Sequence, residues 1–250
     1  MPNALVEVDR DVFLHESVIR FYRVRLQTRM TVLRLSGERL LLYSPTPLDA
    51  ALRAALEAAG RVAWVVSPNK IHNQTLAAYA AAYPDACMVA PPGLAERRPG
   101  LRLDAVIGGD SFPDWQGQVD CALTGGNVFF SELLLFHRAS RSLIVADLVE
   151  NLEPGSASAL ALRLAALFGV PQRPVASPEH RLYTLDADAA AASLARPRTW
   201  DFERILLCHG ACVEHGAKEV FAGVCDEMLG TARRRRALAR AAVRLAARIQ

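Results

Sequence analysis

The sequence lacks a long apolar run. Although 52% of its 250 residues are hydrophobic, no window reaches the roughly eighteen consecutive apolar residues that a membrane-spanning helix needs. The first residues, MPNALVEVDRDVF, carry acidic side chains where a signal peptide would have an apolar segment. We therefore expect a cytoplasmic protein, and the chain is long enough to bury a sizeable core.

Cysteine is also scarce. The chain has five cysteines, an odd number in a sequence with no export signal, which argues against a disulfide framework. Cys208 and Cys212 bracket a histidine in CHGAC, but the second ligand pair that a zinc knuckle needs is missing. The cysteines are predicted to be reduced thiols.

Several catalytic motifs are missing as well. The sequence contains no G-x-S-x-G elbow, no Walker loop and no dinucleotide-binding fingerprint. These absences argue against a serine hydrolase of the nucleophile-elbow type, an NTPase and a nicotinamide-dependent enzyme.

The charge of the chain is nearly balanced, with a net charge of +3, and many of its arginines lie near the C-terminus. Residues from about 229 to 250 are predicted to form an amphipathic helix that packs on the body. Its apolar face would contain Leu238, Ala242, Leu245 and Ile249, and its basic face Arg236, Arg240, Arg244 and Arg248. Because no aromatic residues are interleaved with the arginines, we expect a solvated face and no binding of nucleic acid at physiological salt.

The first half of the chain alternates strand and helix patterns. Residues 29–43 are predicted to form a hairpin around Ser36–Glu38. A helix should follow, capped by Thr46, with Pro47 at its first position and Gly60 at its end. Apolar strands are predicted at VAWVVS (residues 62–67) and CMVA (residues 87–90), with a helix between them.

The second half repeats this alternation. LLLFH (residues 133–137) and SLIVAD (residues 142–147) should pair as a hairpin, and RILLCHG (residues 204–210) should form a last strand. Helices are predicted at residues 156–169 and 186–195. The whole pattern indicates an α/β fold with a layered sheet.

Three of these strands end in a residue able to bind a metal or to transfer a proton: His72, Asp147 and His209. Functional groups gather at strand ends along one edge of a sheet in layered α/β folds, which favours a common site. Each residue also has a structural explanation, because His72 can cap a helix, Asp147 can accept backbone hydrogen bonds and His209 can end a strand. His137 can point into the protein or out of it, and the remaining histidines, His15, His180 and His215, are interpreted as surface or satisfied residues.

The chain resembles the metallo-β-lactamase-fold superfamily, and more closely an uncharacterised domain-of-unknown-function branch of it. The resemblance covers nearly the whole chain, and its most specific segments are RMTVLRL, SPTPLD, SPNKIHN, PPGLAERRPGLRLDAVIG, FHRASRSLIVADLVEN and WDFERILLCHG. It implies an αββα sandwich, here as one domain over residues 1–250, with a metal site between the two sheets. The superfamily ligands lie in an H-x-H-x-D-H loop, a G-H-T-P-G-like turn, a strand-ending aspartate and a final histidine.

Only part of that ligand set is present. In SPNKIH (residues 67–72), Ser67 and Asn69 stand where the first two histidines would be, and Ile71 stands where the aspartate would be. His72 matches the last histidine of the loop. The turn is similar to GGNVF (residues 125–129), with Asn127 near the histidine position. One of the two usual metal sites is therefore expected to be absent.

The resemblance matches Asp147 to the bridging aspartate and His209 to the final histidine, so three of the four ligands of the other site remain. His72, Asp147 and His209 form a sufficient set for one Zn²⁺ or Fe²⁺ ion at most. The resemblance then implies a hydrolase or a hydrolase-related enzyme that acts on a small molecule.

Other polar residues near these strand ends are candidates for the same site. If no metal binds, Lys70 would bind an anionic group while His72 or Asp147 transfers protons; the alternative is that Lys70 is a solvated loop residue. Asn69, Asn127 and Glu132 are predicted to contact the substrate. The sequence leaves two alternatives open, a metal-free pseudoenzyme that binds a ligand or a protein, and a metal-independent acid–base enzyme that performs a rearrangement or a cyclisation.

Overall fold

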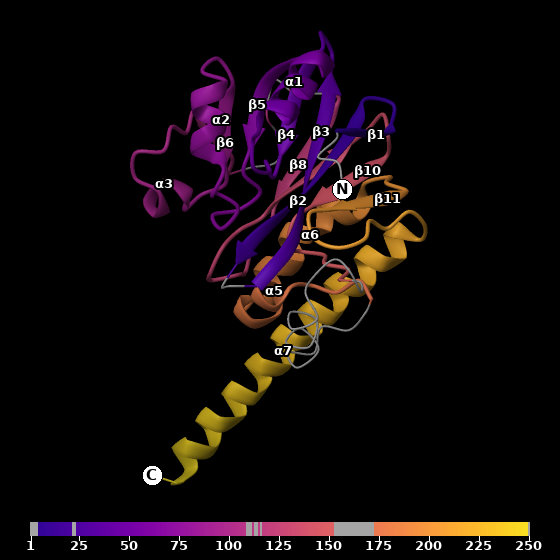
Figure 1. Ribbon diagram of the computed structural model, residues 1–250. Coiled ribbons are helices and arrows are strands. Elements are labelled where there is room, and N and C mark those ends of the chain that lie inside the picture. The colour runs from indigo at the N-terminus through magenta and orange to yellow at the C-terminus, as the bar shows by residue number, and fades with distance from the viewer. Residues whose placement is uncertain are drawn as a thin grey trace.

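The computed structural model describes residues 5–21, 24–108, 112, 115, 117–152 and 173–249. Its strands form two sheets (Figure 1). The first sheet contains, in spatial order, β1 (Val6–Asp9), β2 (Val12–Phe21), β3 (Val24–Leu35), β4 (Arg39–Tyr43), β5 (Arg61–Val66), β6 (Cys87–Ala90) and β7 (Ala105–Val106). The second contains β11 (Arg204–Leu207), β10 (Ser142–Val145), β9 (Leu133–His137) and β8 (Val119–Leu123).

Both predicted hairpins are confirmed. β3 pairs antiparallel with β4, and β9 pairs antiparallel with β10. The chain then switches to parallel pairing, because β4, β5, β6 and β7 run in the same direction, and so do β10 and β11. Parallel neighbours bring their C-terminal ends to one edge of a sheet.

The helices described are α1 (Ala50–Ala59), α2 (Leu76–Ala82), α3 (Leu94–Arg97), α5 (Pro178–Tyr183), α6 (Ala187–Thr199) and α7 (Ala217–Ile249). The predicted helix at residues 186–195 corresponds to α6. The helix predicted at residues 156–169 lies outside the described residues. None of the helices in the described part of the chain is both long and apolar enough to cross a membrane.

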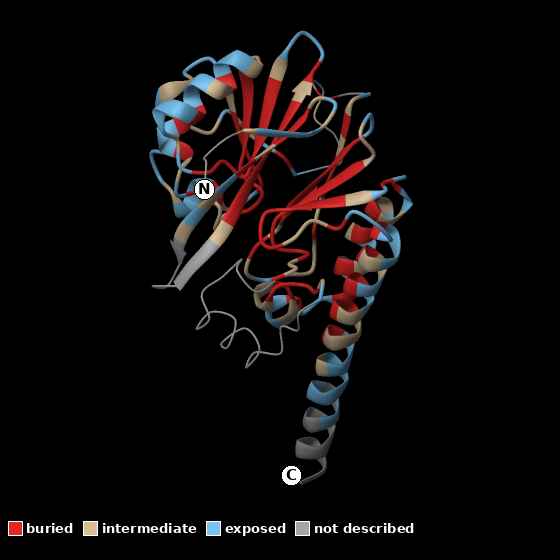
Figure 2. Ribbon diagram, turned by 45° about the vertical axis from the view of Figure 1, so that its right-hand side comes forward, coloured by how far each residue is buried: buried red, intermediate tan, exposed pale blue. Residues whose placement is uncertain are grey.

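Apolar residues form three layers (Figure 2). The middle layer fills the space between the sheets and includes Leu41, Trp64, Leu135, Ile144 and Leu206. A second layer packs the outer face of the first sheet against α1 and α2, and includes Leu40, Leu42, Leu52, Leu56 and Tyr79. The third packs the second sheet against α6 and α7, and includes Leu143, Val145, Leu194, Phe221 and Val224. Two sheets between two helix layers confirm the predicted αββα sandwich.

The first helix begins later than predicted. Asp49, not Thr46, caps α1, and its Oδ1 accepts the backbone N–H of Leu52 at 2.8 Å. Thr46 is buried, and its Oγ1 lies 2.7 Å from Nδ1 of His15. The prediction failed because both residues suit an N-cap, and a tertiary partner on β2 engages one of them. The predicted end at Gly60 is confirmed, since its N–H donates to the carbonyl of Leu56.

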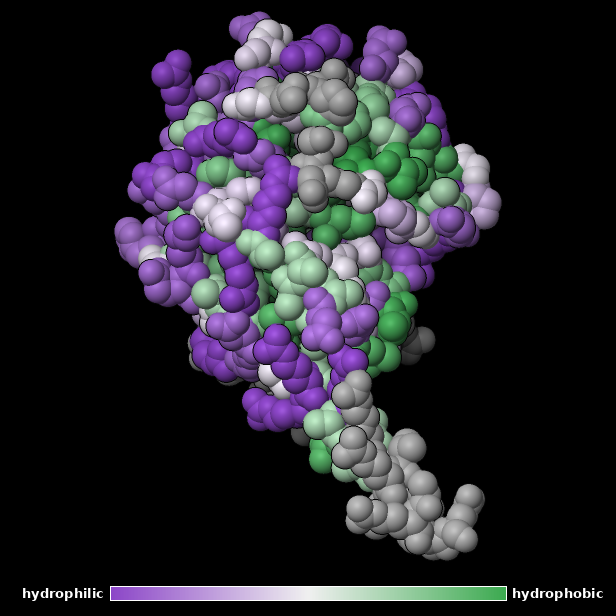
Figure 3. Space-filling model, turned by 180° about the vertical axis from the view of Figure 1, so that it is seen from behind, coloured by the Kyte–Doolittle hydropathy of each residue, from purple (hydrophilic) through white to green (hydrophobic). Residues whose placement is uncertain are grey.

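The last helix is longer than predicted, and its buried face lies elsewhere. α7 starts at Ala217, and its buried side chains run from Ala217 to Ala232. Leu238, predicted to lie on the packed face, is 70% exposed. The reason is tertiary: α7 extends past the body, where no sheet lies beneath it (Figure 1, Figure 2). Hydrophilic and hydrophobic side chains both lie where the helix leaves the body (Figure 3). The side chains of residue 240 and of residues 242–249 are outside the described set.

Candidate metal centre

Strand register brings two of the predicted ligands to the same height. Val145 of β10 is directly opposite Leu207 of β11 in the parallel pair. Asp147 and His209 each follow two residues later, so both side chains leave the sheet at one edge. The loop after β5 brings His72 to that edge from the other sheet.

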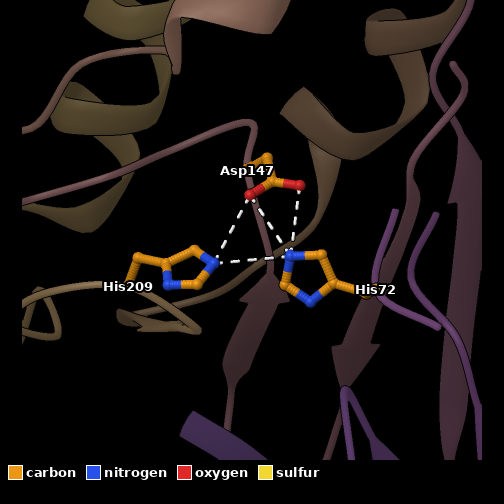
Figure 4. A group of neighbouring side chains, drawn as sticks. All are labelled: His72, Asp147 and His209. Carbon is orange, nitrogen blue, oxygen red and sulfur yellow. Dashed lines mark hydrogen bonds and ion pairs between the residues drawn. The ribbon is translucent and has the colours of Figure 1, made fainter. Parts of the chain in front are cut away.

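The three side chains point toward one another (Figure 4). Nε2 of His72 lies 3.3 Å from Oδ1 of Asp147, and Nε2 of His209 lies 3.5 Å from the same oxygen. The two Nε2 atoms are 3.4 Å apart. All three side chains are nearly buried, with exposed fractions of 12% for His72, 7% for Asp147 and 3% for His209.

This spacing fits a metal ion. Two ligand atoms about 2.1 Å from a tetrahedral zinc ion are separated by about 3.4 Å. The triangle of 3.3, 3.5 and 3.4 Å has these dimensions. Two imidazoles and one carboxylate are also a donor set that Zn²⁺ and Fe²⁺ accept. The residues present therefore fit one ion.

Hydrogen bonds at the back of each ring orient the two histidines. Nδ1 of His209 lies 2.9 Å from the carbonyl oxygen of Gln27. A carbonyl only accepts, so Nδ1 carries the proton and Nε2 of His209 keeps its lone pair. Nδ1 of His72 lies 2.9 Å from Oγ of Ser44. Such partners at the second nitrogen are typical of metal-binding histidines.

Ser67 and Asn69, which the resemblance aligns with the first two loop histidines, stabilise the loop by hydrogen bonds. Ser67 is fully buried, and its Oγ donates to the carbonyls of Asn69 and His72 at 2.8 Å each. Oδ1 of Asn69 accepts the backbone N–H groups of Ile71 and His72. These bonds hold the loop in the conformation that directs His72 toward the site.

Asn69 also contacts the carboxylate. Its Nδ2 donates to Oδ2 of Asp147 at 2.6 Å. Nε2 of His72 lies 3.3 Å from both carboxylate oxygens, and Oδ1, which Asn69 does not bind, is the oxygen that also faces Nε2 of His209 at 3.5 Å. Asn69 was predicted to contact the substrate. Its side chain is fully buried, and its described hydrogen bonds connect the loop to Asp147.

Burial and mutual proximity shift the pKa values of the three groups in different directions. Burial lowers the pKa of His72, but the adjacent Asp147 carboxylate outweighs this effect, and the pKa is raised above 6.5. Burial lowers the pKa of His209 more than Asp147 raises it, so the net shift is downward. Burial raises the pKa of Asp147, but His72, His209 and the Asn69 amide lower it well below its usual range. Without a cation, a proton on His72 balances the carboxylate.

This proton balance predicts how zinc binding depends on pH. A protonated His72 stabilises the metal-free fold below pH 6.5, and this contribution is lost as the pH rises through the raised pKa. Nε2 must lose the same proton to bind zinc, so apparent affinity should fall about tenfold per pH unit below that pKa and level off above it. Melting temperatures with and without zinc across the pH range test this. If the increase in melting temperature caused by zinc becomes larger toward acid pH, the prediction is wrong.

The other predicted site residues lie around this triangle without joining it. Nζ of Lys70 lies 4.7 Å from the ring centroid of Phe129, so its described contact is with an aromatic ring. Oδ1 of Asn127 accepts the N–H groups of Phe129 and Phe130, and its Nδ2 donates to the carbonyl of Glu179. Glu132 is fully buried beneath the turn that carries Asp147.

Two further residues, Ser44 and Arg29, orient the histidines of the site, and neither was predicted from the sequence. Ser44 directly follows β4, the parallel neighbour of β5, so the strand-end rule that selected His72 also applies to it. Arg29 on β3 is buried, and its Nη1 donates to the carbonyls of Leu207 and Gly210, on either side of His209. No sequence signal marked Arg29, because its partners lie far away along the chain.

One family model matches the sequence over more than half of its length. The family model described as a domain of unknown function, DUF4336, matches residues 10–182. The chain belongs to the DUF4336 family. No curated protein matches the sequence of this DUF4336 member.

Solved structures show what its fold is similar to. The DIM-1 metallo-β-lactamase exposed to ceftazidime aligns with a TM-score of 0.62 and 13% identity, over 90% of this chain and 96% of its own. The mono-zinc form of the metallo-β-lactamase FIM-1 from Pseudomonas aeruginosa gives 0.61 and 13%, over 93% and 96%. The metal-soaked Flv1 flavodiiron core from Synechocystis gives 0.62 and 12%, over 91% of this chain and 60% of that one. The DUF4336 chain therefore has the metallo-β-lactamase fold, as the sequence resemblance implied.

Proposed function

We propose that this DUF4336 protein binds one zinc or iron ion through His72, Asp147 and His209 and acts as a hydrolase-like enzyme on a small molecule. The observation that carries the proposal is the triangle of donor atoms, with sides of 3.3 to 3.5 Å. When bound, the ion would supply Lewis-acid activation of water or of a substrate carbonyl.

The chain's own residues support this role by holding the donors in place before any ion arrives. Ser44 and the carbonyl of Gln27 orient the two imidazoles, and Asn69 orients the carboxylate. Preorganised ligands lose little freedom on binding, which favours affinity. A proton released from Nε2 of His72 would leave the site as the ion enters.

The residues at the positions of the remaining superfamily ligands do not favour a second metal ion. Ser67 and Asn69 occupy the two histidine positions of the resemblance, and both are fully buried and hydrogen-bonded. Asn127, near the third position, binds the backbone of its own loop and of α5. A mononuclear site is therefore the arrangement that these residues support.

One observation favours a second candidate function, acid–base catalysis without a metal. His72 and Asp147 form a close pair at 3.3 Å, and the carboxylate raises the pKa of the imidazole. Such a pair would transfer a proton to or from a bound substrate. Lys70, in the loop that carries His72, would bind an anionic group of the substrate in this metal-free case.

Metal analysis separates the two candidates. Protein purified without chelator is expected to contain about one zinc or iron ion per chain, and His209→Ala should remove it. His215→Ala serves as the matched control, because His215 is an exposed histidine outside the triangle. A wild-type protein that contains neither metal and binds neither when it is added would overturn the metal proposal in favour of acid–base catalysis.

A further inference from the structure

Glu132 lies directly behind the turn that carries Asp147. It immediately precedes β9, and its side chain is fully buried. Oε1 accepts the backbone N–H of Ala146 at 2.8 Å, and Oε2 accepts those of Asp147 and Leu148 at 2.9 Å each. One carboxylate therefore binds three consecutive amides, with Asp147 in the middle.

A ring of hydrogen bonds connects this carboxylate to α5. Nε2 of His180 lies 3.2 Å from Oε2 of Glu132. The backbone N–H of His180 donates to Oγ of Ser177, and the backbone N–H of Ser177 donates to the carbonyl of Asp147. The ring starts and ends at Asp147, so the backbone of this residue is held on both sides.

The hydrogen-bond pattern also identifies the charge at this position. The three amides only donate, and Nε2 of His180 lies 3.2 Å from Oε2 as a fourth polar neighbour. A group surrounded by donors is stabilised as the ionised, acceptor-only carboxylate. Glu132 therefore places a negative charge in the interior, directly behind the backbone of Asp147.

A second negative charge would favour a divalent cation in the ligand triangle. Two neutral imidazoles and one carboxylate provide a single negative charge, whereas Zn²⁺ and Fe²⁺ carry two positive charges. A second buried carboxylate that does not touch the ion completes the balance, and interactions of this kind remain strong where water is excluded.

We propose that Glu132 is a positioning residue of this metal centre, which fixes the Asp147 turn and supplies the second negative charge for a divalent cation. This inference rests on the proposed function. It also gives Glu132 a different role from the substrate contact predicted from the sequence, because a fully buried side chain presents no surface to a substrate.

Glu132→Gln tests the inference, because glutamine keeps the shape but removes the charge and turns one acceptor into a donor facing the amides. Zinc affinity, measured by competition with a chromogenic chelator, is expected to fall about 10–100-fold. The d–d absorption spectrum of the Co²⁺-loaded protein should change as well, because Asp147 is held less firmly. In the metal-free protein, hydrogen exchange at the amides of residues 146–148 should become faster.

Leu56→Ala is the matched control. Leu56 is fully buried on the helix side of the first sheet, away from the site, so this variant should lose thermal stability and keep its zinc affinity. If Glu132→Gln fails to fold, His180→Phe takes its place, because it removes the ring nitrogen that faces Glu132 and leaves the three amide bonds intact. A smaller loss of zinc affinity is then expected.

The outcomes distinguish the two proposals. Zinc affinity in Glu132→Gln that falls no further than in Leu56→Ala overturns the positioning role. A wild-type protein that binds neither zinc nor iron overturns the proposed function instead. Amide exchange at residues 146–148 then still tests whether Glu132 fixes the Asp147 turn. If hydrogen exchange at the amides of residues 146–148 is unchanged in Glu132→Gln, Glu132 does not fix the turn.

Discussion

Replacing Asp147 by asparagine is expected to remove most of the bound metal while the fold survives. The substitution keeps the shape of the side chain but deletes the negative charge nearest to both imidazoles. Loss of a direct ligand should weaken zinc binding more than the roughly 10–100-fold that follows the loss of an outer partner. Metal content and any hydrolytic activity should fall together.

The new amide also conflicts with its neighbour. Nδ2 of Asn69 donates to Oδ2 of Asp147, so an amide nitrogen at that position would face another donor. If the amide turns, its nitrogen points at the imidazoles instead. An unsatisfied buried donor costs about 1–3 kcal/mol, which should lower the melting temperature by several degrees and leave the protein folded at room temperature.

The measurement is a paired one of metal content and melting temperature in both proteins. Asp120→Asn is a suitable control, because Asp120 lies on β8, away from the triangle, and forms an ion pair with Arg138, which directly follows β9. This control should retain its metal. An Asp147→Asn protein that melts several degrees lower and yet keeps all its metal would show that Asp147 only supports a turn.

Gly210→Ala is expected to cause the largest loss of stability. Gly210 follows His209 with a φ of +82°, which is a left-handed conformation that favours glycine. A Cβ at this position would lie 1.9 Å from the carbonyl oxygen of Asn151. That oxygen also accepts the N–H of Ala211, so it cannot move without breaking the turn.

The free energy of unfolding of Gly210→Ala should be about 3–5 kcal/mol lower than that of wild type, which is in the range of the most damaging single substitutions. His209 should shift as well, because Arg29 binds the carbonyl of Gly210, and zinc affinity should fall with stability. Urea denaturation of the metal-free protein measures the first effect.

Gly223→Ala provides the control for Gly210→Ala. Gly223 lies in α7 and has open space where a Cβ would be. Alanine favours a helix over glycine by about 1 kcal/mol, so this variant should be slightly more stable than wild type. Equal stabilities of the two alanine variants would contradict the clash at Gly210.

The hydrophobic pattern of the sequence was sufficient to predict most elements of the fold. The hairpins, the apolar strands and the end of α1 at Gly60 depend on neighbours within a few residues, and the structure confirms them. The same local pattern placed His72, Asp147 and His209 at strand ends. Because parallel strands end at a common edge, the sequence alone was enough to select the three residues of the triangle.

Predictions from local sequence were wrong where the pattern within one segment allowed two structures. Thr46 and Asp49 both suit a helix cap, and His15 on another strand engages Thr46. Leu238 continues an amphipathic pattern, but no sheet lies beneath it. A sequence pattern describes which face of a helix is apolar, and only the surrounding structure determines how far along the helix that face is covered.

The sequence by itself determined the layered α/β pattern and placed three candidate residues at strand ends, because both follow from periodicity and strand order; the resemblance to the metallo-β-lactamase-fold superfamily implied the αββα sandwich and the ligand roles. Tertiary structure alone decided how those ligands are held. Gln27 orients His209 across 182 positions of sequence, and Ser44 orients His72 across 28. Glu132, which looked like a substrate contact, is buried beneath Asp147. Such hydrogen bonds depend on distances of a few tenths of an ångström between remote segments, and no local pattern encodes them.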